Sequence, residues 1–569
     1  MENLAGRLED LQSDGQLLTK VGRHPVVVFW HEEQAWAIAD RCPHLGLPLH
    51  KGTVETGMVT CHWHHARFDL SSGCTLDPWA DDAVAYDVEV RDGDVFVATR
   101  PDADAKARLS ARLEDGLEDQ ITLVTAKSVL GLLDLGEPVA DIVAIGAQFG
   151  AKNRSQGWSS GMTVLTAMAN VVPWLDPDDR PLALTQSLAF LARDVGGHPP
   201  RFALDPLGGT KVDAERLTDW YRRFIDTRSG DAAERTLATA LADGTATRAE
   251  VEAMMFAAAT DHVFIDEGHT IDFTNKAFEL IDLMGPDSAP LLLPTLVHQT
   301  AAATRHEELS EWRHPHDLAA LIERTTLTAG LTSNSNRWPD NEVAELGWRL
   351  LDDDPEQVVD ALVGAAGAGA DAEQLARAVA FAAALRILRF HTQNDHRDWN
   401  SVHHGFTTAN AVHQAMVREP TAELLRGVVH SALKVYLDRF LNIPAARPPV
   451  AESGTVADLA ACWDAQGQVE EAGRQAYGFL AAGGEPTELI AALGHALLHE
   501  DTEFHWFQLY EAAVRQFQAW PAGSEEGRLI LSAFARFLAA HTPTRRELSR
   551  VVDIARRLGR GDELFAEPA

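Results

Sequence analysis

Two short motifs of cysteine and histidine near the start of the chain restrict its fold more than any other feature. Cys42-Pro43-His44 is followed, after sixteen residues, by Cys61-His62-Trp63-His64. Two such loops place two thiolates and two imidazoles on facing turns, a donor set that suits tetrahedral zinc or a [2Fe-2S] cluster with mixed ligands. The first hundred residues must therefore fold so that these two loops meet.

The surrounding residues predict short strands and turns. β-Branched and apolar runs occur at residues 26–29, 36–38 and 95–98, and residues 84–90 alternate between apolar and polar. Asp92-Gly93 separates two of these runs, which is a hairpin signal. We therefore expect a small all-β domain over residues 1–102.

The flanking residues of both loops resemble a known family. The segments 41–46 (RCPHLG) and 61–69 (CHWHHARFD), with Gly73 following, resemble the two cluster loops of Rieske iron-sulfur domains. The resemblance covers about a sixth of the chain and favours the cluster over zinc. It implies that Cys42 and Cys61 bind one iron of a [2Fe-2S] cluster while His44 and His64 bind the other. Such clusters have potentials of roughly −150 to +300 mV, which suits an electron relay.

The loops also indicate which branch of the Rieske family the first domain resembles. Respiratory Rieske proteins carry one further Cys in each loop and join the two by a disulfide, whereas this chain has Leu47 and His62 or Trp63 there. It therefore resembles the ferredoxin and ring-hydroxylating oxygenase branch. We expect Cys74 to be a buried structural thiol, and Cys462 to be structural as well.

The charge and composition exclude several classes of partner. The formal net charge is −35, which repels nucleic acid and anionic membranes. No apolar run reaches the roughly 18 residues of a membrane span, and the first residues lack the basic flank and apolar core of a secretion signal, so we expect neither. We expect a cytoplasmic protein that binds neither nucleic acid nor membrane. No glycine-rich dinucleotide fingerprint is present, so a separate reductase must supply the electrons.

Beyond residue 101 the pattern becomes helical. Ala, Leu, Glu and Arg dominate and apolar residues recur at spacings of three and four, which predicts an all-α region over residues 115–569. Residues 272–277, 405–410, 506–511 and, less well, 158–163 align with one another. These likenesses predict about four repeat units that form a helical array or a closed toroid. Their approximate bounds are 120–230, 231–352, 353–450 and 455–569.

Histidine is the unusual component of this region, because 17 of the 24 His lie beyond residue 100. His262, Asp266 and His269 are spaced for one face of one helix, and two His with a carboxylate can bind an oxygen-activating iron. His495, His499 and Glu503 repeat the helical spacing. A helix-borne His is more often structural. We nevertheless predict that a His-lined cavity carries the catalysis, with these residues taking part: His262, Asp266, His269, His391, His403, His404 and His505.

A second, weaker resemblance concerns the same helices. His391 and the stretch from His403 to Ala411 are similar to the questin oxidase-like proteins, helical oxidoreductases associated with ring-opening oxygenation of polyketides. The resemblance would cover about residues 115–560, and it implies an oxidative chemistry. A second metal at His262, Asp266 and His269, or a noncovalent haem, is compatible with the sequence.

These features favour one function over two alternatives. We expect a Rieske-dependent oxygenase, in which the cluster feeds electrons to the His-lined site and O2 oxidises a small organic substrate of aromatic or polyketide-like kind. The first alternative is an electron-transfer or redox-sensing protein whose helical array docks a partner. A hydrolase is a third interpretation, but the chain lacks a nucleophile motif and the cluster would have no role.

Overall fold

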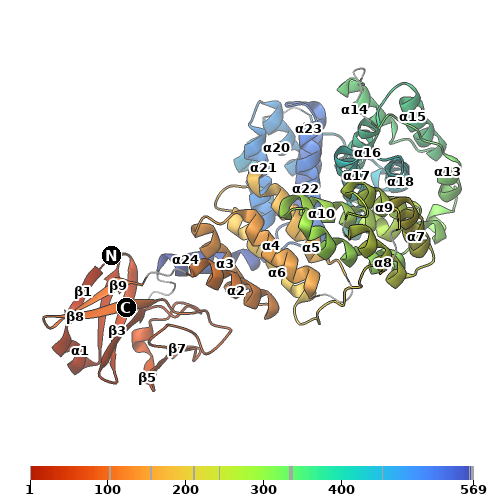
Figure 1. Ribbon diagram of the computed structural model, residues 1–569. Helices are drawn as coiled ribbons and strands as arrows, with labels where there is room; N and C mark the ends of the chain where they lie inside the picture. Colours follow the sequence, from red (N-terminus) through yellow and green to blue (C-terminus); the bar gives the residue numbers. More distant parts are fainter. Residues whose placement is uncertain are drawn as a thin grey trace. The chain divides into compact units, whose positions relative to one another are not determined.

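The computed structural model describes residues 2–100, 104–153, 157–208, 212–242, 244–331, 337–450, 453–562 and 564. Contacts divide the chain into two compact units, one of Met1–Ile145 with Glu547–Ala569 and one of Gly146–Arg546 (Figure 1). The expected small β domain followed by a large helical region is confirmed. The predicted boundary at residue 102 lies outside the described residues, and the division into four repeat units stays a prediction.

The first unit begins with two antiparallel sheets. The larger has the strand order β1-β9-β8-β4-β3-β2 and the smaller the order β5-β6-β7. The predicted hairpin is present, since Asp92 and Gly93 both have positive φ between β8 and β9. The strands are β1 (Glu2–Arg7), β2 (Gln16–Val21), β3 (His24–His31), β4 (Gln34–Ala39), β5 (Thr53–Glu55), β6 (Met58–Thr60), β7 (Arg67–Asp69), β8 (Ala85–Arg91) and β9 (Asp94–Thr99).

The packing of strand β3 explains why its sequence is apolar at successive positions and does not alternate with polar residues. Val27 and Phe29 pack with Val59 and Phe68 of the smaller sheet, while Val26 and its neighbours on the other face pack with Leu11 of a short helix. Both faces of β3 are therefore buried. Cys42 and Cys61 belong to the core between the sheets, so the two motif loops rest on packed side chains.

Helices complete the first unit. Helix α1 connects strands β1 and β2 of the β domain. Helix α3 packs against both α2 and the C-terminal helix α24. The bounds are α1 (Leu8–Asp14), η1 (Leu49–Lys51), α2 (Ala105–Glu118), α3 (Thr122–Asp134), α4 (Val139–Lys152), which crosses into the second unit, and α24 (Leu548–Arg560).

The second unit, called the helical unit below, consists of helices and turns throughout its described residues. The α-helices are α5 (Ser160–Val171), α6 (Arg180–Val195), α7 (Ala214–Asp226), α8 (Gly230–Leu241), α9 (Arg248–Thr260), α10 (His269–Met284), α11 (Ala289–Leu292), α12 (Val297–Ala302), α13 (Leu318–Arg324), α14 (Asp340–Arg349), α15 (Pro355–Gly367), α16 (Ala372–Leu388), α17 (Trp399–Arg418), α18 (Leu424–Leu437), α19 (Val456–Cys462), α20 (Val469–Ala481), α21 (Pro486–Leu498), α22 (Phe504–Gln518) and α23 (Glu525–His541). The 3-10 turns are η2 (Val172–Trp174), η3 (Ile265–Gly268), η4 (Pro286–Ser288), η5 (Leu293–Leu296), η6 (His306–Glu308), η7 (Ser310–Trp312), η8 (His396–Asp398) and η9 (Asp438–Asn442).

Four of these helices contact one another in a closed ring. Helix α5 packs against α10 and α22, and α17 packs against the same two helices. The four aligned sequence segments lie at the beginning of these helices or within them. The ring is the arrangement expected of an array that closes on itself, so it favours the predicted repeats.

Buried polar contacts fix how the ring helices align. Lys276 of α10 forms ion pairs with Glu279 at 2.8 Å and with Glu511 of α22 at 2.9 Å, and Asn170 of α5 donates hydrogen bonds to both carboxylates. Gln516 of α22 donates to Asn410 of α17 at 2.9 Å. Because these buried groups pair in one register, they fix how α10, α17 and α22 lie against one another.

Across the described residues, no helix combines the length and the apolar character that a bilayer crossing requires.

Candidate functional site

The two motif loops of the β domain have the same backbone construction. The Cys42 N–H donates to Leu47 and the Gly46 N–H donates to Cys42. In the second loop Cys61 and Ala66 form the equivalent bond, and the His65 N–H donates to Cys61 at 3.0 Å. Gly46 and His65 occupy the same place in each loop, and both have positive φ. Each loop thus closes on itself and holds its Cys and His in a fixed turn.

The four predicted ligands lie together between the loops. Cys42 and Cys61 are 2% and 1% exposed, and a hydrogen bond between their thiols lowers the pKa of Cys61 while it raises that of Cys42. The rings of His44 and His64 have centroids 4.7 Å apart. His44 Nδ1 is buried without a hydrogen-bond partner, which is costly unless a ligand satisfies it. Buried sulfur and outer imidazole fit a mixed-ligand cluster.

Neighbouring residues support the loops. Trp63 stacks on His64 with ring centroids 4.8 Å apart, and Trp79 meets the edge of His44. Gly73 has a φ of +76°, and a Cβ there would lie 1.9 Å from the carbonyl oxygen of Ala83, so only glycine fits. Lys127 of α3 donates to the carbonyl of Pro43, a contact that no sequence motif indicates. Cys74 is exposed, so the expectation of a buried thiol there was wrong.

Comparison with known proteins agrees with this geometry. The family model described as Rieske [2Fe-2S] domain matches residues 2–87. Residues 2–87 form a Rieske domain. It binds a [2Fe-2S] cluster, and its chemistry is electron transfer.

Several relatives share part of the chain. Apoptosis-inducing factor 3 of Homo sapiens is 31% identical over 91 residues, which are 16% of this chain and 15% of that protein. Ferredoxin CarAc of Metapseudomonas resinovorans is 29% identical over 82 residues, 14% of this chain and 77% of the ferredoxin. The solved ferredoxin of carbazole 1,9a-dioxygenase from Nocardioides aromaticivorans IC177 is 24% identical, with a TM-score of 0.17, over 18% of this chain and 99% of its own. Each of these three matches is about as long as the Rieske domain, so none covers the helical unit.

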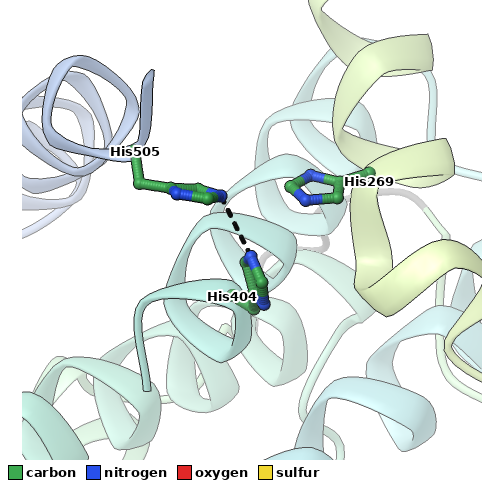
Figure 2. A group of neighbouring side chains, drawn as sticks. All are labelled: His269, His404 and His505. Carbon is green, nitrogen blue, oxygen red and sulfur yellow. Dashed lines mark hydrogen bonds between the residues drawn. The ribbon is translucent and has the colours of Figure 1, made fainter. Parts of the chain in front are cut away.

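A second group of histidines comes together in the helical unit. His269 begins α10, His404 lies in α17 and His505 lies in the first turn of α22. Their ligand nitrogens all lie within 4.8 Å of one another, and the Nε2 atoms of His404 and His505 are 3.0 Å apart. Figure 2 shows the three rings converging from three separate helices. These residues are called the three-histidine group below.

Burial keeps two of these imidazoles neutral. Loss of hydration, with a smaller contribution from the neighbouring His404, lowers the pKa of His269 to about 4 and that of His505 to about 2. A neutral imidazole retains a lone pair for a metal or a proton. At neutral pH His269 and His505 are therefore nitrogen donors.

A carboxylate orients one of the three rings. Glu267 Oε2 lies 3.1 Å from His404 Nδ1, and this hydrogen bond lowers the pKa of Glu267 to about 2. With Nδ1 facing the carboxylate, Nε2 of His404 faces His505 at 3.0 Å. Carboxylate–histidine pairs of this kind set the tautomer of metal-binding His.

The turn before His269 has a strained backbone. Asp266 and Glu267 have φ of 54° and 55°, and Gly268 follows with φ of 91°. A left-handed residue other than Gly costs roughly 1–2 kcal/mol. A Cβ at Gly268 would lie 1.8 Å from Oγ1 of Thr408 on α17. The turn therefore packs directly on the helix that carries His404, and strain of this kind gathers at functional sites.

This turn corrects one expectation. The spacing predicts His262, Asp266 and His269 on one face of one helix, but α9 ends at Thr260 and α10 begins at His269. Gly268 and the carboxylates before it interrupt the predicted helix. His262 instead places Nδ1 2.8 Å from Glu307. Neither His262 nor Asp266 is among the ligand atoms that converge with His269.

The other predicted histidines fall in two classes. His403 is fully buried, its ring lies 4.0 Å from that of His505, and neither of its ring nitrogens has a partner. His391 lies in the turn after α16, where its Nδ1 accepts a hydrogen bond from the Gln393 N–H. The structure thus brings His403 to the three-histidine group, whereas His391 is outside it. Catalytic roles for all of these residues stay predictions.

A cavity of about 500 Å³ adjoins the group. His404 and Glu267 form part of its wall, together with aromatic and polar side chains from the turns around residues 306–318 and from α18 and η9. Two lining groups, Tyr436 Oη and His306 Nδ1, are buried without a hydrogen-bond partner. No sequence pattern predicted Tyr436 or His306, because neither residue belongs to a motif.

A further group of possible ligands lies elsewhere in the helical unit. Asp179, His495 and His499 have ligand atoms within 4.8 Å of one another. His495 Nδ1 is 2.9 Å from Asp179, whose hydrogen bond raises the pKa of His495. The expected helical run through Glu503 was wrong, since α21 ends at Leu498 and Glu503 precedes α22. The ion pair with Asp179 explains the position of the His495 side chain, which is 59% exposed, without a bound metal.

Proposed function

We propose that the chain is a Rieske-dependent oxidoreductase that oxidises a small organic substrate with O2 in the cavity of the helical unit. The observation that carries this proposal is the three-histidine group at a cavity wall, in a chain that also holds a one-electron carrier. Without an electron acceptor in the helical unit, the Rieske domain would have no partner within the chain.

The reaction we propose inserts one oxygen atom into a C–H bond, RH + O2 + 2e⁻ + 2H⁺ → ROH + H2O. The two electrons come one at a time from a separate reductase, because the chain has no dinucleotide fingerprint. The [2Fe-2S] cluster supplies single electrons when bound, with Cys42, His44, Cys61 and His64 as its ligands. One oxygen atom goes to the substrate and the other leaves as water.

The lining of the cavity suggests how a substrate is held. Phe264, Tyr436 and Phe440 offer aromatic surface, and planar rings pack well on such walls. The unpartnered Tyr436 hydroxyl and His306 nitrogen can bond to polar substituents of a substrate. We therefore favour an aromatic substrate that carries hydroxyl or carbonyl groups, with its reacting carbon near His404.

Turnover measurements on the full-length chain test this function. The chain is mixed with oxygenated buffer, a panel of monocyclic and polycyclic phenols, and a ferredoxin reductase with reduced nicotinamide that supplies both electrons, and is analysed for hydroxylated product. We expect product from the wild type and none from His404→Gln, while the reduced-state paramagnetic signal of the cluster is unchanged in both. His413→Gln, on the same helix, is the matched control and should retain activity. Equal product from His404→Gln and wild type would overturn the proposal.

One observation favours a second candidate. Relatives of the Rieske domain include a protein named anthranilate 1,2-dioxygenase ferredoxin subunit, from Burkholderia cepacia, so this chain can instead be an electron carrier or redox sensor whose helices dock a partner. Reduction of added cytochrome c at the same rate by wild type and His404→Gln, with no O2 uptake, would support this second function. The resemblance of the helices to questin oxidase-like proteins stays a prediction.

A further inference from the structure

We propose that His269, His404 and His505 bind one divalent first-row transition-metal ion in the helical unit. Three imidazoles without a thiolate form a donor set that suits iron, zinc, copper and nickel. The existence of the site stands on geometry alone. The choice of iron among these metals rests on the proposed function, because a zinc ion does not accept electrons.

The distance between two of the three ligands matches a shared ion. Two nitrogens bound to one ion at about 2.1 Å, with an angle of about 90°, are separated by about 3.0 Å. The Nε2 atoms of His404 and His505 are 3.0 Å apart, and the ligand nitrogen of His269 lies within 4.8 Å of both. The three rings point toward one another from separate helices (Figure 2), which leaves further coordination positions for other ligands.

The surroundings hold these rings as a metal site requires. Glu267 accepts the Nδ1 proton of His404 and leaves its Nε2 free for an ion. The left-handed turn ending at Gly268 sets the start of α10, and hence His269, against α17. These contacts position two of the three ligands before any ion binds.

An unsatisfied neighbour points to the same place. His403 is completely buried and has no partner at either ring nitrogen, although its ring lies 4.4 Å from that of His404 and 4.0 Å from that of His505. A buried polar ring without partners is rare in proteins unless a ligand or ion satisfies it. We assign His403 as a positioning residue that interacts with the ligand shell of the ion.

Metal analysis of the full-length chain tests the site. Wild-type protein isolated with iron should contain three iron atoms per chain, two of them in the cluster. His505→Gln and His269→Gln should each contain two, with the visible spectrum of the cluster unchanged. His495→Gln alters the other candidate group and should retain three. Loss of the third iron in His495→Gln and its retention in His505→Gln would overturn the assignment, as would a wild type with two iron atoms and no other bound transition metal.

A metal titration tests the same site without relying on how much iron the isolated protein contains or on whether the ligand variants fold. The full-length chain with both Cys42→Ala and Cys61→Ala, which leaves no thiolate at the cluster loops, is titrated with Co²⁺ and followed by its visible ligand-field absorption. We expect one equivalent to bind, and Glu267→Gln added to this chain should weaken binding by about 10–100-fold. The Glu267 change leaves the three ligands in place, so an unaltered affinity would contradict the role given to Glu267. Absence of any absorption would overturn the site.

These outcomes separate the site from the proposed function. A chain with a third metal but no oxidation of any tested substrate keeps the site and loses the oxygenase proposal. A chain that oxidises substrate with two iron atoms and no other bound transition metal keeps the oxygenase proposal and loses the site. His404→Gln should remove both the third iron and the activity.

Discussion

The cluster loops of the Rieske domain and the three-histidine group of the helical unit use the same kind of side chain but acquire their geometry differently. Each cluster loop closes on itself through hydrogen bonds between residues at most five apart, such as Cys42 with Leu47. In the helical unit, His269 and His505 are adjacent only because whole helices pack in one register. The first geometry is therefore local, and the second depends on distant contacts. Changes in either unit can test this difference.

The largest expected effect is the loss of the whole cluster in Cys61→Ala. Removing one of two buried thiolates leaves an incomplete ligand set, so the reduced-state paramagnetic signal should vanish. Because the cluster geometry is local, the thermal unfolding transition of the helical unit should not move. Circular dichroism at a helical wavelength measures that transition. A large shift would show that the two units are not independent, and a retained signal would exclude Cys61 as a ligand.

Lys276→Met should disturb the helical unit most. Lys276 is buried with Glu279 and Glu511. Burial alone raises the pKa of Glu279, but Lys276 and Arg515 hold it at about 2. Removing one partner of a buried ion pair typically costs about 3–5 kcal/mol. Urea unfolding should show this loss while the cluster spectrum stays intact. Adding Glu511→Gln removes one of the stranded carboxylates and should restore part of the stability; no recovery would argue against the pairing.

The same difference explains what the sequence could and could not predict. Cys42, His44, Cys61 and His64 lie in contiguous motifs, so both the β domain and its cofactor followed from them. His404 and His505 were both among the predicted catalytic residues, and the structure has them in contact. The error at His262 arose because helical spacing was extended across a turn. Gly268, directly before His269, has a left-handed φ that does not fit a helix interior, and the spacing took no account of it. The cavity lining comes from turns without periodicity, so no pattern marked Tyr436 or His306.

Gly268→Ala tests the strained turn. The added Cβ would clash with Oγ1 of Thr408 at 1.8 Å in a residue with φ of +91°, so we expect a loss of about 2–3 kcal/mol or more, from backbone strain and overpacking together. Gly285, at the other end of α10, has φ of +96°, and a Cβ added there would meet no atom within 4 Å. Gly285→Ala should therefore cost only the backbone term, about 1–2 kcal/mol. Urea midpoints of the two variants compare them directly.

The Gly268→Ala change should also affect metal binding by the three-histidine group. If the turn positions His269, Gly268→Ala should also weaken Co²⁺ binding by the helical unit, whereas Gly285→Ala should not. Equal losses of stability in the two variants would mean that the contact with Thr408 is relaxed without cost. Unchanged metal affinity in Gly268→Ala would show that His269 is placed by the packing of α10 alone.

The last prediction concerns acid stability, which should distinguish the helical unit from the β domain. Burial, with a contribution from Arg426, lowers the pKa of His430 to about 3, against weaker opposition from Glu307 and Asp261. The folded pKa lies below the unfolded value of about 6.5, so only the unfolded chain takes up a proton as the pH falls. The stabilisation is complete above pH 6.5 and declines between about pH 6.5 and 3, by about 1.4 kcal/mol per pH unit.

Replacing this histidine should therefore flatten the pH dependence of stability. We expect the free energy of unfolding of His430→Gln, measured with urea from pH 6.5 to 4.5, to fall less steeply than that of the wild type by the equivalent of one proton. His499→Gln, which alters a ring at the surface of the helical unit, is the control and should keep the wild-type slope. The transition of the β domain, followed through the cluster absorption, should show the same pH dependence in all three chains. Identical slopes for His430→Gln and wild type would mean that His430 takes up its proton in the folded chain, and that its neighbours compensate the burial.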